Sequence, residues 1–382
     1  MLLITGGAGF IGSCIVRQLI SAGRSVRVLD SLSEQIHGKA AGEPTWASHP
    51  LVDFVRGSVT ERSDWGRALD GVREIVHLAA ETGTGQSMYE ISRYTTCNAL
   101  GTGLMLEALR ESTSARVRRV LLASSRSIYG EGAYCCDHCG LARTIPDART
   151  GGELAAGRWD PRCPVCAATL TAIPTSESDP PRTASIYAAT KWTQEEYVRI
   201  GCASLGIDHV VLRLQNVYGE GQSLQNPYTG ILSIFSNRIR VGSELPIFED
   251  GLESRDFVHV EDVASSFLAA IDRADPIAGV INVGSGRATS VAEVAHQLGR
   301  ALGLEARTRV TGQYRLGDIR HNFADISRLQ AVLGYRPQIS LEEGLGRFAR
   351  WVLSRAHGVD RLDSANRELV ERGLMGMYEG EA

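Results

Sequence analysis

A glycine-rich turn near the start of the sequence constrains the fold of this chain more than any other feature. Residues 1–5 are apolar and β-prone, and the segment from Thr5 to Gly12 reads TGGAGFIG and opens a helix-like stretch. Such a turn lets the backbone approach a pyrophosphate closely, and the helix N-terminus presents free N–H groups and a positive dipole end. We therefore expect a dinucleotide-binding unit. The residues expected to contact the dinucleotide are Gly6, Gly9, Phe10, Ile11 and Gly12.

The next β-rich run, residues 25–30, ends at Asp30. A carboxylate at this place can accept hydrogen bonds from both ribose hydroxyls, and it would repel a 2′-phosphate. The sequence therefore predicts NAD rather than NADP as the cofactor, although an Asp that ends a strand is also a common turn former.

Five cysteines cluster between residues 135 and 166, within a loop-like stretch rich in Gly and Pro. Four of them form two Cys-x-x-Cys pairs with 23 residues between the pairs: Cys136, Cys139, Cys163 and Cys166. This is the ligand spacing of a four-thiolate zinc site, in which the tetrahedral shell is closed and the metal is structural. Cys135 and His138 are then spare, and a set of unligated cysteines is the alternative.

Strand-like and helix-like segments alternate along the first third of the chain. The β-rich runs are 1–5, 25–30, 52–56, 74–78 and 119–124, and amphipathic stretches lie between them. This alternation is typical of βαβ units. The expected fold class is α/β: a doubly wound Rossmann-type parallel sheet, a smaller C-terminal α/β substrate lobe and a zinc-stapled insertion. The expected domains are a dinucleotide-binding domain (1–130 and 174–221), a zinc-binding insertion (131–173), a lobe mainly for substrate (222–356) and a C-terminal tail (357–382).

Composition excludes several classes of protein. With 43% hydrophobic and 22% charged residues the chain is ordinary for a globular protein, and no run of residues is long and apolar enough to span a bilayer. The net charge of −4 argues against nucleic acid as the main partner, although four arginines keep this option open for the insertion: Arg143, Arg149, Arg158 and Arg162. A turn already at residue 6 leaves no room for a signal peptide, so we expect a cytoplasmic protein.

Tyr187 and Lys191 lie four residues apart near the start of a helix predicted from Ser185 to about Leu205. This spacing places both side chains on one face. An ammonium beside a phenol, together with a cationic nicotinamide ring, would lower the pKa of the tyrosine and make it a general base. The pair alone is a weak signal, because many helices carry such pairs on a solvated face.

Together, these segments resemble the extended short-chain dehydrogenases, and specifically their NAD-dependent epimerase/dehydratase branch, which acts on nucleotide sugars. The resemblance covers nearly the whole chain, and its motifs occur in the family's order. They are Thr5–Gly12, His77–Ala80, Asn98–Thr102, Ser124–Gly130, Tyr187–Lys191, Arg213–Gly219, Arg255–Val260 and Arg315–Asp318.

The resemblance implies a role for each matching residue. Ser125, Tyr187 and Lys191 would be catalytic: the serine hydrogen-bonds the reacting hydroxyl, the tyrosine is the base, and the lysine tunes it and holds the nicotinamide ribose. Further cofactor contacts would come from Leu78, Ala79, Ala80 and Asn98, and substrate contacts from Ser125, Arg126, Asn216, Arg255, Arg315 and Asp318. An arginine suits a diphosphate because its rigid fork meets phosphate oxygens in pairs.

The resemblance also narrows the reaction. A 4,6-dehydratase of this family carries an Asp-Glu pair where this chain has Arg126 and Ser127, so dehydration is disfavoured and a 4-epimerase with a 4-keto intermediate is expected. The cysteine insertion resembles those of bacterial members similar to dTDP-rhamnose 4-epimerases, which implies a dTDP-6-deoxyhexose such as dTDP-rhamnose. A dehydratase, a decarboxylase, a reductase and a non-catalytic NAD- and zinc-binding regulator stay open as alternatives.

Two further expectations concern assembly and the insertion. The resemblance implies a homodimer formed through helices like the one with Tyr187, although its apolar positions could equally belong to the core. The insertion leaves the chain just after Tyr129 and returns before Tyr187, so it is expected to lie near the reaction cleft and could close over the substrate.

Overall fold

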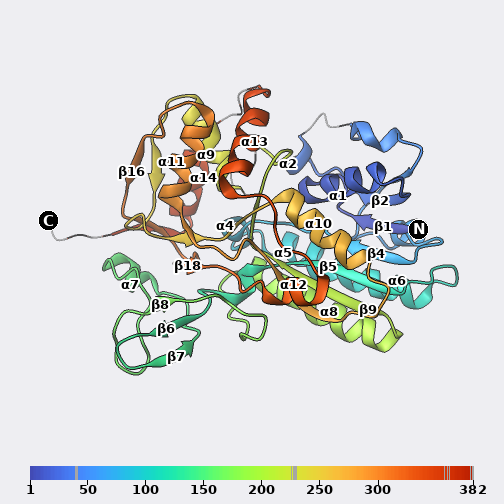
Figure 1. Cartoon of the computed structure of the whole chain (residues 1–382), viewed down its shortest axis with the longest axis horizontal. Helices are drawn as coiled ribbons and strands as arrows, with labels where there is room; N and C mark the ends of the chain where they lie inside the picture. The colour runs from blue at the N-terminus through green and yellow to red at the C-terminus, as the bar shows by residue number, and fades with distance from the viewer. Residues whose placement is uncertain are drawn as a thin grey trace.

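A parallel β-sheet forms the centre of the molecule (Figure 1). The computed structural model describes residues 1–38, 42–224, 230–356 and 362–378, and the single residues 226, 358, 360 and 380. Within them the main sheet has seven strands in the order β14-β9-β5-β4-β1-β2-β3, all parallel. The strands are β1 (Leu2–Thr5), β2 (Val26–Asp30), β3 (Val52–Arg56), β4 (Glu74–His77), β5 (Arg119–Ser125), β9 (Asp208–Leu214) and β14 (Gly279–Val283). The predicted doubly wound α/β fold is confirmed.

Helices cover both faces of this sheet because alternate strand residues point to opposite sides. Leu2 and Ile4 of β1 pack on one side, whereas Leu3 packs on the other. The first side is covered by α1 (Phe10–Ser21), α10 (Val260–Ile271) and α12 (Ser327–Leu333), and the second by α3 (Arg62–Ala68), α6 (Gly101–Glu111) and α8 (Ile186–Leu205).

Short helical segments connect the main elements. They are α2 (Glu34–His37), the 3₁₀ helix Thr45–Ser48, α4 (Thr84–Ser87), α5 (Ile91–Tyr94), the π-helix Thr95–Leu100 and the 3₁₀ helix Arg126–Tyr129. Across the described part of the chain, no helix combines the length and apolar character that a membrane crossing requires.

A second lobe has its own apolar core. Three helices, α9 (Ile231–Arg240), α11 (Val291–Leu302) and α13 (Leu341–Leu353), bury Phe235, Leu298 and Phe348 against one another. Short strand pairs complete the lobe: β10 (Asn216–Tyr218) with β13 (Phe257–His259), β11 (Leu245–Ile247) with β16 (Thr308–Val310), and β12 (Ser254–Arg255) with β15 (Thr289–Ser290) and β18 (His321–Asn322).

Segments that follow residue 222 contribute to both lobes. Strand β14 and helices α10 and α12 come from the segment predicted as mainly substrate lobe, yet they complete the dinucleotide-binding sheet and its cover. The chain therefore crosses between the lobes several times, and the cleft between them is lined from both.

The insertion folds as a small unit of its own, at the lower left of Figure 1. Its strands β6 (Tyr134–Cys136), β7 (Leu141–Thr144) and β8 (Thr171–Ala172) form an antiparallel sheet in the order β7-β6-β8. Helix α7 (Gly151–Ala155) begins with a capping box in which Thr150 and Glu153 bond each other's backbone N–H groups. The unit's small core contains Tyr134, Cys136, Cys163 and Leu170.

The tail is part of the second lobe. Helix α14 (Leu362–Glu371) buries Leu362, Ala365 and Leu369, and strand β19 (Met375–Met377) pairs antiparallel with β17 (Gln313–Arg315). Residue Met375 lies opposite Arg315, so the end of the chain is joined to a segment that was predicted to bind substrate.

Candidate active site

Two adjoining cavities open where the central strands end. The larger, of about 540 Å³, is lined by residues that follow β1, β2, β4, β5 and β9, and the smaller, of about 230 Å³, lies on the second-lobe side. Five residues line both cavities, so the cavities meet along them: Thr84, Arg126, Asn216, Gly230 and Ile231. The carboxyl edge of a doubly wound sheet is the usual ligand-binding place of this architecture.

The glycine-rich turn packs so closely that side chains would not fit. A Cβ at Gly6, whose φ is +68°, would lie 2.8 Å from the backbone nitrogen of Ala79, and a Cβ at Gly12 would overlap the carbonyl oxygen of Gly6. Gly9 is the N-cap of helix α1, and no side chain among the described residues caps this end, so the first N–H groups of the helix are free for an anion. The turn therefore fits the pyrophosphate of a dinucleotide.

Asp30 is fixed at the end of β2. Its Oδ2 accepts the N–H of Ala8 at 2.9 Å and its Oδ1 accepts that of Leu32 at 2.8 Å, while the residue still lines the larger cavity. The carboxylate therefore faces the place that the sequence assigned to a ribose.

Most of the predicted cofactor residues line the larger cavity: Gly6, Gly9, Phe10, Ile11, Gly12, Asp30, Leu78, Ala79, Ala80, Tyr187 and Lys191. Asn98 does not. Its Oδ1 accepts the N–H of Glu81 at 2.8 Å, and its Nδ2 donates to the Glu81 carbonyl and to Thr190 Oγ1 at 3.1 and 3.0 Å. These bonds occupy the amide inside the protein, so Asn98 holds the Glu81 loop against α8 instead of facing the cavity.

Ser125, Tyr187 and Lys191 line the same cavity. Ser125 ends β5, whereas the other two lie in the first turns of α8, which Ser185 caps by accepting the N–H of Ala188 at 3.2 Å. The Tyr187 N–H donates to Ser87 Oγ at 3.0 Å, so a second helix helps to fix the start of α8. The three predicted catalytic side chains are thus brought together from distant parts of the sequence.

Burial and two neighbouring groups act on the pKa of Tyr187. Burial raises its pKa, and the Ser125 hydroxyl and the Arg126 guanidinium lower it without compensating for burial. Lys191 donates instead to the Ala123 carbonyl at 2.9 Å, and burial lowers the pKa of its ammonium to about 8. Arg126, which the resemblance assigned to the substrate, is thus a cation that lowers the pKa of the phenol.

The predicted substrate residues Arg126, Asn216, Arg255, Arg315 and Asp318 all line the smaller cavity. Arg255 Nη2 pairs with Asp318 Oδ1 at 2.9 Å. Arg315 Nε and Asn216 Oδ1 are buried and have no hydrogen-bond partner within the described part of the chain. A buried, unpaired guanidinium N–H beside a second arginine suits an anionic ligand.

Sequence reasoning missed part of the lining. Leu362, Leu369 and Leu374 of the tail form an apolar wall of the smaller cavity, and their amphipathic spacing could have indicated a packed helix. Glu253 also lines it, and burial raises the pKa of this carboxyl to about 7. No local motif marks Glu253, because its burial results from packing between elements distant in sequence.

The four expected cysteines form a single cluster. Their Sγ atoms all lie within 4.8 Å of one another, and the two closest approaches, Cys136 to Cys166 and Cys139 to Cys163, are 3.5 and 3.6 Å. The edge of a tetrahedron with Zn–S bonds of about 2.3 Å measures about 3.8 Å, so the thiols fit zinc. Cys135 lies outside the cluster and contacts Asp137.

The insertion does not close over the cavities. None of residues 131–173, all of which are described, lines either of them. Arg149 is buried among carboxylates, so it does not face solvent as a nucleic-acid site would require, whereas Arg143 is exposed and pairs with Asp179.

Comparison with known proteins agrees with the geometry. The sequence matches the NAD dependent epimerase/dehydratase family over residues 2–143 and 165–284. It is 38% identical over 354 residues to the dTDP-L-rhamnose 4-epimerase of Burkholderia thailandensis, covering 92% of this chain and 94% of that one.

Solved structures are similar over nearly the whole chain. The UDP-glucose 4-epimerase of Thermotoga maritima with UDP-glucose matches with a TM-score of 0.72 at 28% identity. The match covers 92% of this chain and 97% of that one. The UDP-glucose 4-epimerase of Thermus thermophilus in complex with NAD matches with a TM-score of 0.70 at 26% identity. This match covers 93% of this chain and 99% of that one. The chain belongs to the NAD-dependent epimerase/dehydratase family, as its motifs from the glycine-rich turn to Asp318 indicated.

Proposed function

We propose that this chain is a nucleotide-sugar 4-epimerase that uses NAD and acts on a dTDP-6-deoxyhexose, with dTDP-L-rhamnose as the first choice. The observation that carries the proposal is the meeting of Ser125, Tyr187 and Lys191 in one cavity that joins an arginine-lined second cavity. The similarity to the B. thailandensis enzyme supports this choice of substrate.

The larger cavity is assigned to NAD. The N-terminus of α1 would hold the pyrophosphate, Asp30 the adenosine ribose and Lys191 the nicotinamide ribose. When bound, NAD accepts the hydride from C4 of the sugar and returns it, so the sugar passes through a 4-keto form.

Tyr187 moves the proton in both directions. Its phenolate accepts the proton of the C4 hydroxyl as the C4–O bond becomes a carbonyl, and the phenol returns that proton after the sugar has presented its other face. Ser125 hydrogen-bonds the same oxygen, and the nearby Arg126 charge favours the phenolate. No net oxidation results, which is the balance that an epimerase requires.

The smaller cavity is assigned to the substrate diphosphate. Arg255 and Arg315 approach it from β12 and β17, and Asn216 from β10. The apolar wall that includes Leu369 and Phe248 suits the base and deoxyribose, since these parts of the substrate carry little charge.

Dehydration is disfavoured because Arg126 and Ser127 lie where an acid and base pair would be needed. Arg126 is half-buried, and desolvation lowers its pKa only to about 10, so it stays a cation at neutral pH. A decarboxylase, a reductase or a non-catalytic regulator is distinguished from an epimerase by its products, or by their absence.

The cysteine cluster is assigned to one structural zinc ion. Four thiolates leave no open coordination position, so the metal would order the insertion without taking part in the reaction. A cytoplasmic location is part of this proposal, because eight cysteines that form no disulfide suit a reducing compartment.

A homodimer is proposed through the outer side of α8 and the neighbouring helical segment. Apolar side chains are exposed on these elements, at Ile91, Leu100, Tyr197 and Ile200, with exposed fractions of 43 to 56%. Contacts place α5 and the π-helix beside α8, so the elements that carry these residues are neighbours. Light scattering of the wild type and of Ile200→Asp tests it, and a wild-type monomer would contradict it.

The experiment that tests the proposed function is an incubation of the purified protein with a panel of dTDP- and UDP-sugars without added cofactor. Product mass and anomeric NMR identify the reaction. An isomer of unchanged mass formed from dTDP-L-rhamnose supports the proposal. Loss of water or of carbon dioxide would move the assignment to a dehydratase or a decarboxylase, and no conversion even with added NAD would favour a binding protein.

A further inference from the structure

The insertion packs behind the segment that carries two of the predicted substrate residues, Arg315 and Asp318. The ring of Trp159 lies 6.4 Å from that of Tyr314 in β17 and 6.0 Å from that of Tyr378 after β19. The insertion therefore contacts the substrate segment from the side opposite the cavity.

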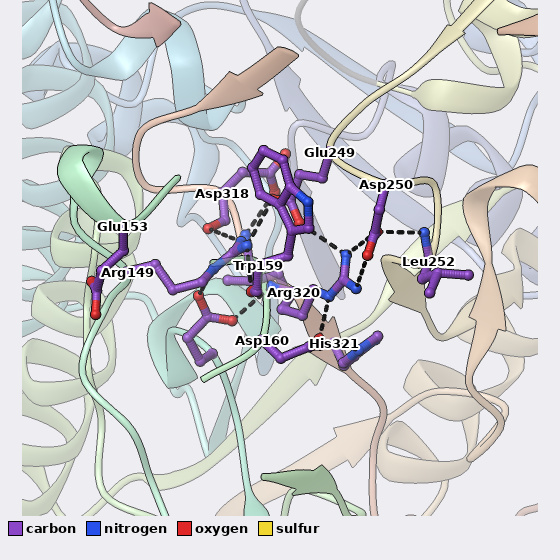
Figure 2. Close-up of polar contacts among 12 residues, drawn as sticks. Arg149, Glu153, Trp159, Asp160, Glu249, Asp250, Leu252, Asp318, Arg320 and His321 are labelled. Carbon is purple, nitrogen blue, oxygen red and sulfur yellow. Dashed lines mark hydrogen bonds and ion pairs between the residues drawn. The ribbon is translucent and has the colours of Figure 1, made fainter. Parts of the chain in front are cut away.

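Arg149 of the insertion makes the central polar contacts of this interface (Figure 2). Its Nε donates to Glu131 at 2.8 Å, and its Nη1 donates to Glu249 at 2.8 Å and to the Trp159 carbonyl at 3.0 Å. Its Nη2 donates to the backbone carbonyl of Asp318 at 3.2 Å. One buried guanidinium thus joins the insertion, the second lobe and the substrate segment.

The same two carboxylates also hold Arg320. Glu131 Oε2 accepts a hydrogen bond from the backbone N–H of Arg320 at 2.6 Å. Glu249 Oε2 accepts one from Arg320 Nη1 at 3.0 Å. Asp160 of the insertion accepts Arg320 Nε at 2.7 Å. The backbone is therefore fixed on both sides of Ile319, at the carbonyl of residue 318 and the N–H of residue 320.

This fixed backbone determines where Arg255 lies. Arg255 Nη2 pairs with the Asp318 carboxylate at 2.9 Å, and its Nη1 donates to the Arg320 carbonyl at 3.1 Å. Arg255 and Asp318 both line the smaller cavity, whereas Arg149 does not. A shift of residues 318–320 would move the guanidinium that faces the ligand.

The charges make Arg149 difficult to replace. Burial alone would lower its pKa, but the carboxylates of Glu131 and Glu249 raise it above the usual value. Burial raises the pKa of Glu249, and Arg149 is the main group that counteracts this effect. A lysine would keep the charge, but as a point charge it could not reach four acceptors in the directions of a planar fork.

We propose that Arg149 is a positioning residue for substrate binding: through Asp318 and Arg320 it orients Arg255 toward the diphosphate of the nucleotide sugar. This inference rests on the proposed function for its assignment of the smaller cavity. It makes the insertion part of the substrate site without any direct contact with the ligand.

The test compares Arg149→Lys with the matched control Arg162→Gln. Arg162 is an exposed arginine of the same insertion, and its guanidinium bonds Thr169 within that unit. The dissociation constants of dTDP and of NAD are measured by calorimetry, and kcat and KM with dTDP-L-rhamnose.

Arg149→Lys should weaken dTDP binding and raise KM by about tenfold, the loss expected from a misplaced charge-assisted hydrogen bond. It should leave NAD binding unchanged and kcat within about twofold, since the contact acts on the ground state and the transition state alike. Arg162→Gln should change none of these values. A purely structural role would lower the melting temperature and reduce NAD and dTDP binding together.

The possible failures are distinguishable. Unchanged dTDP affinity in folded Arg149→Lys, or an equal loss in Arg162→Gln, would overturn this inference alone. Wild-type protein that binds neither dTDP nor UDP would overturn it together with the proposed function. If Arg149→Lys does not fold, Glu131→Gln keeps one of its two acceptor bonds and should weaken dTDP binding to a smaller degree, and unchanged affinity there would also overturn the inference.

Discussion

Lys191 donates a hydrogen bond from Nζ to the carbonyl oxygen of Ala123 at 2.9 Å, and this bond ties helix α8 to strand β5 two residues before Ser125. Burial removes water from the ammonium, and a neutral carbonyl does not stabilise the charge as much as that water would, so the pKa of Lys191 falls to about 8. The same bond sets the spacing between the helix that carries Tyr187 and the strand that carries Ser125. The reacting groups are thus positioned by the central sheet.

Tyr187→Phe should lower kcat by about 10²- to 10⁴-fold, because the proton of the C4 hydroxyl loses its acceptor. NAD binding should persist, since the ring remains in the cavity wall. Tyr197→Phe, an exposed tyrosine on the same helix, is the matched control. Conversion by Tyr187→Phe at the wild-type rate would remove Tyr187 from the role of base.

Arg126→Met should displace the pH dependence of kcat toward higher pH. The Arg126 charge lowers the pKa of Tyr187, so its removal raises that pKa, and a smaller fraction of phenolate is present at any pH below it. Arg126→Lys should restore part of the shift because the charge returns. A profile that stays in place or moves to lower pH would contradict this assignment.

Purified protein should contain about one zinc ion per chain, and Cys139→Ser should lose it. Cys135→Ser is the control, because Cys135 is a neighbouring thiol outside the cluster. Metal content is measured by plasma mass spectrometry and stability by thermal unfolding, with a lower melting temperature expected for Cys139→Ser. Equal metal content in the two variants would exclude the four-thiolate site.

Leu369→Ala should raise KM several-fold for the nucleotide sugar and leave NAD binding unchanged. Leu369 is buried and forms part of the wall of the smaller cavity, so truncation removes apolar contact with the ligand and costs roughly 2–5 kcal/mol of stability. Val370→Ala is the control, since Val370 is 54% exposed. Steady-state kinetics at a temperature where both variants are folded decide the point, and equal KM values would place the tail outside the site.

The features that the sequence predicted correctly rest on local chemistry. The Thr5–Gly12 turn, the strand that ends at Asp30 and the first five strands depend on short-range geometry, and the structure has them where they were expected. The two Cys-x-x-Cys pairs likewise required only that two tight turns meet.

The features that were missed depend on contacts between distant segments. Arg149 bonds the Asp318 carbonyl 169 residues away, and no local pattern distinguishes it from an exposed arginine. The family motif placed Asn98 near the cofactor, but its amide is used by Glu81 and Thr190. Helical spacing placed Tyr187 and Lys191 on one face, but it could not show that Lys191 donates to the Ala123 carbonyl.

The most direct test of the central claim uses dTDP-L-rhamnose labelled with deuterium at C4, incubated with the protein in ordinary water without added NAD. If Tyr187 and Ser125 act on the C4 oxygen while bound NAD takes and returns the hydride, the product is the C4 epimer with unchanged mass and with the deuterium still on C4. Loss of the deuterium to solvent, or a product of different mass, would contradict the account.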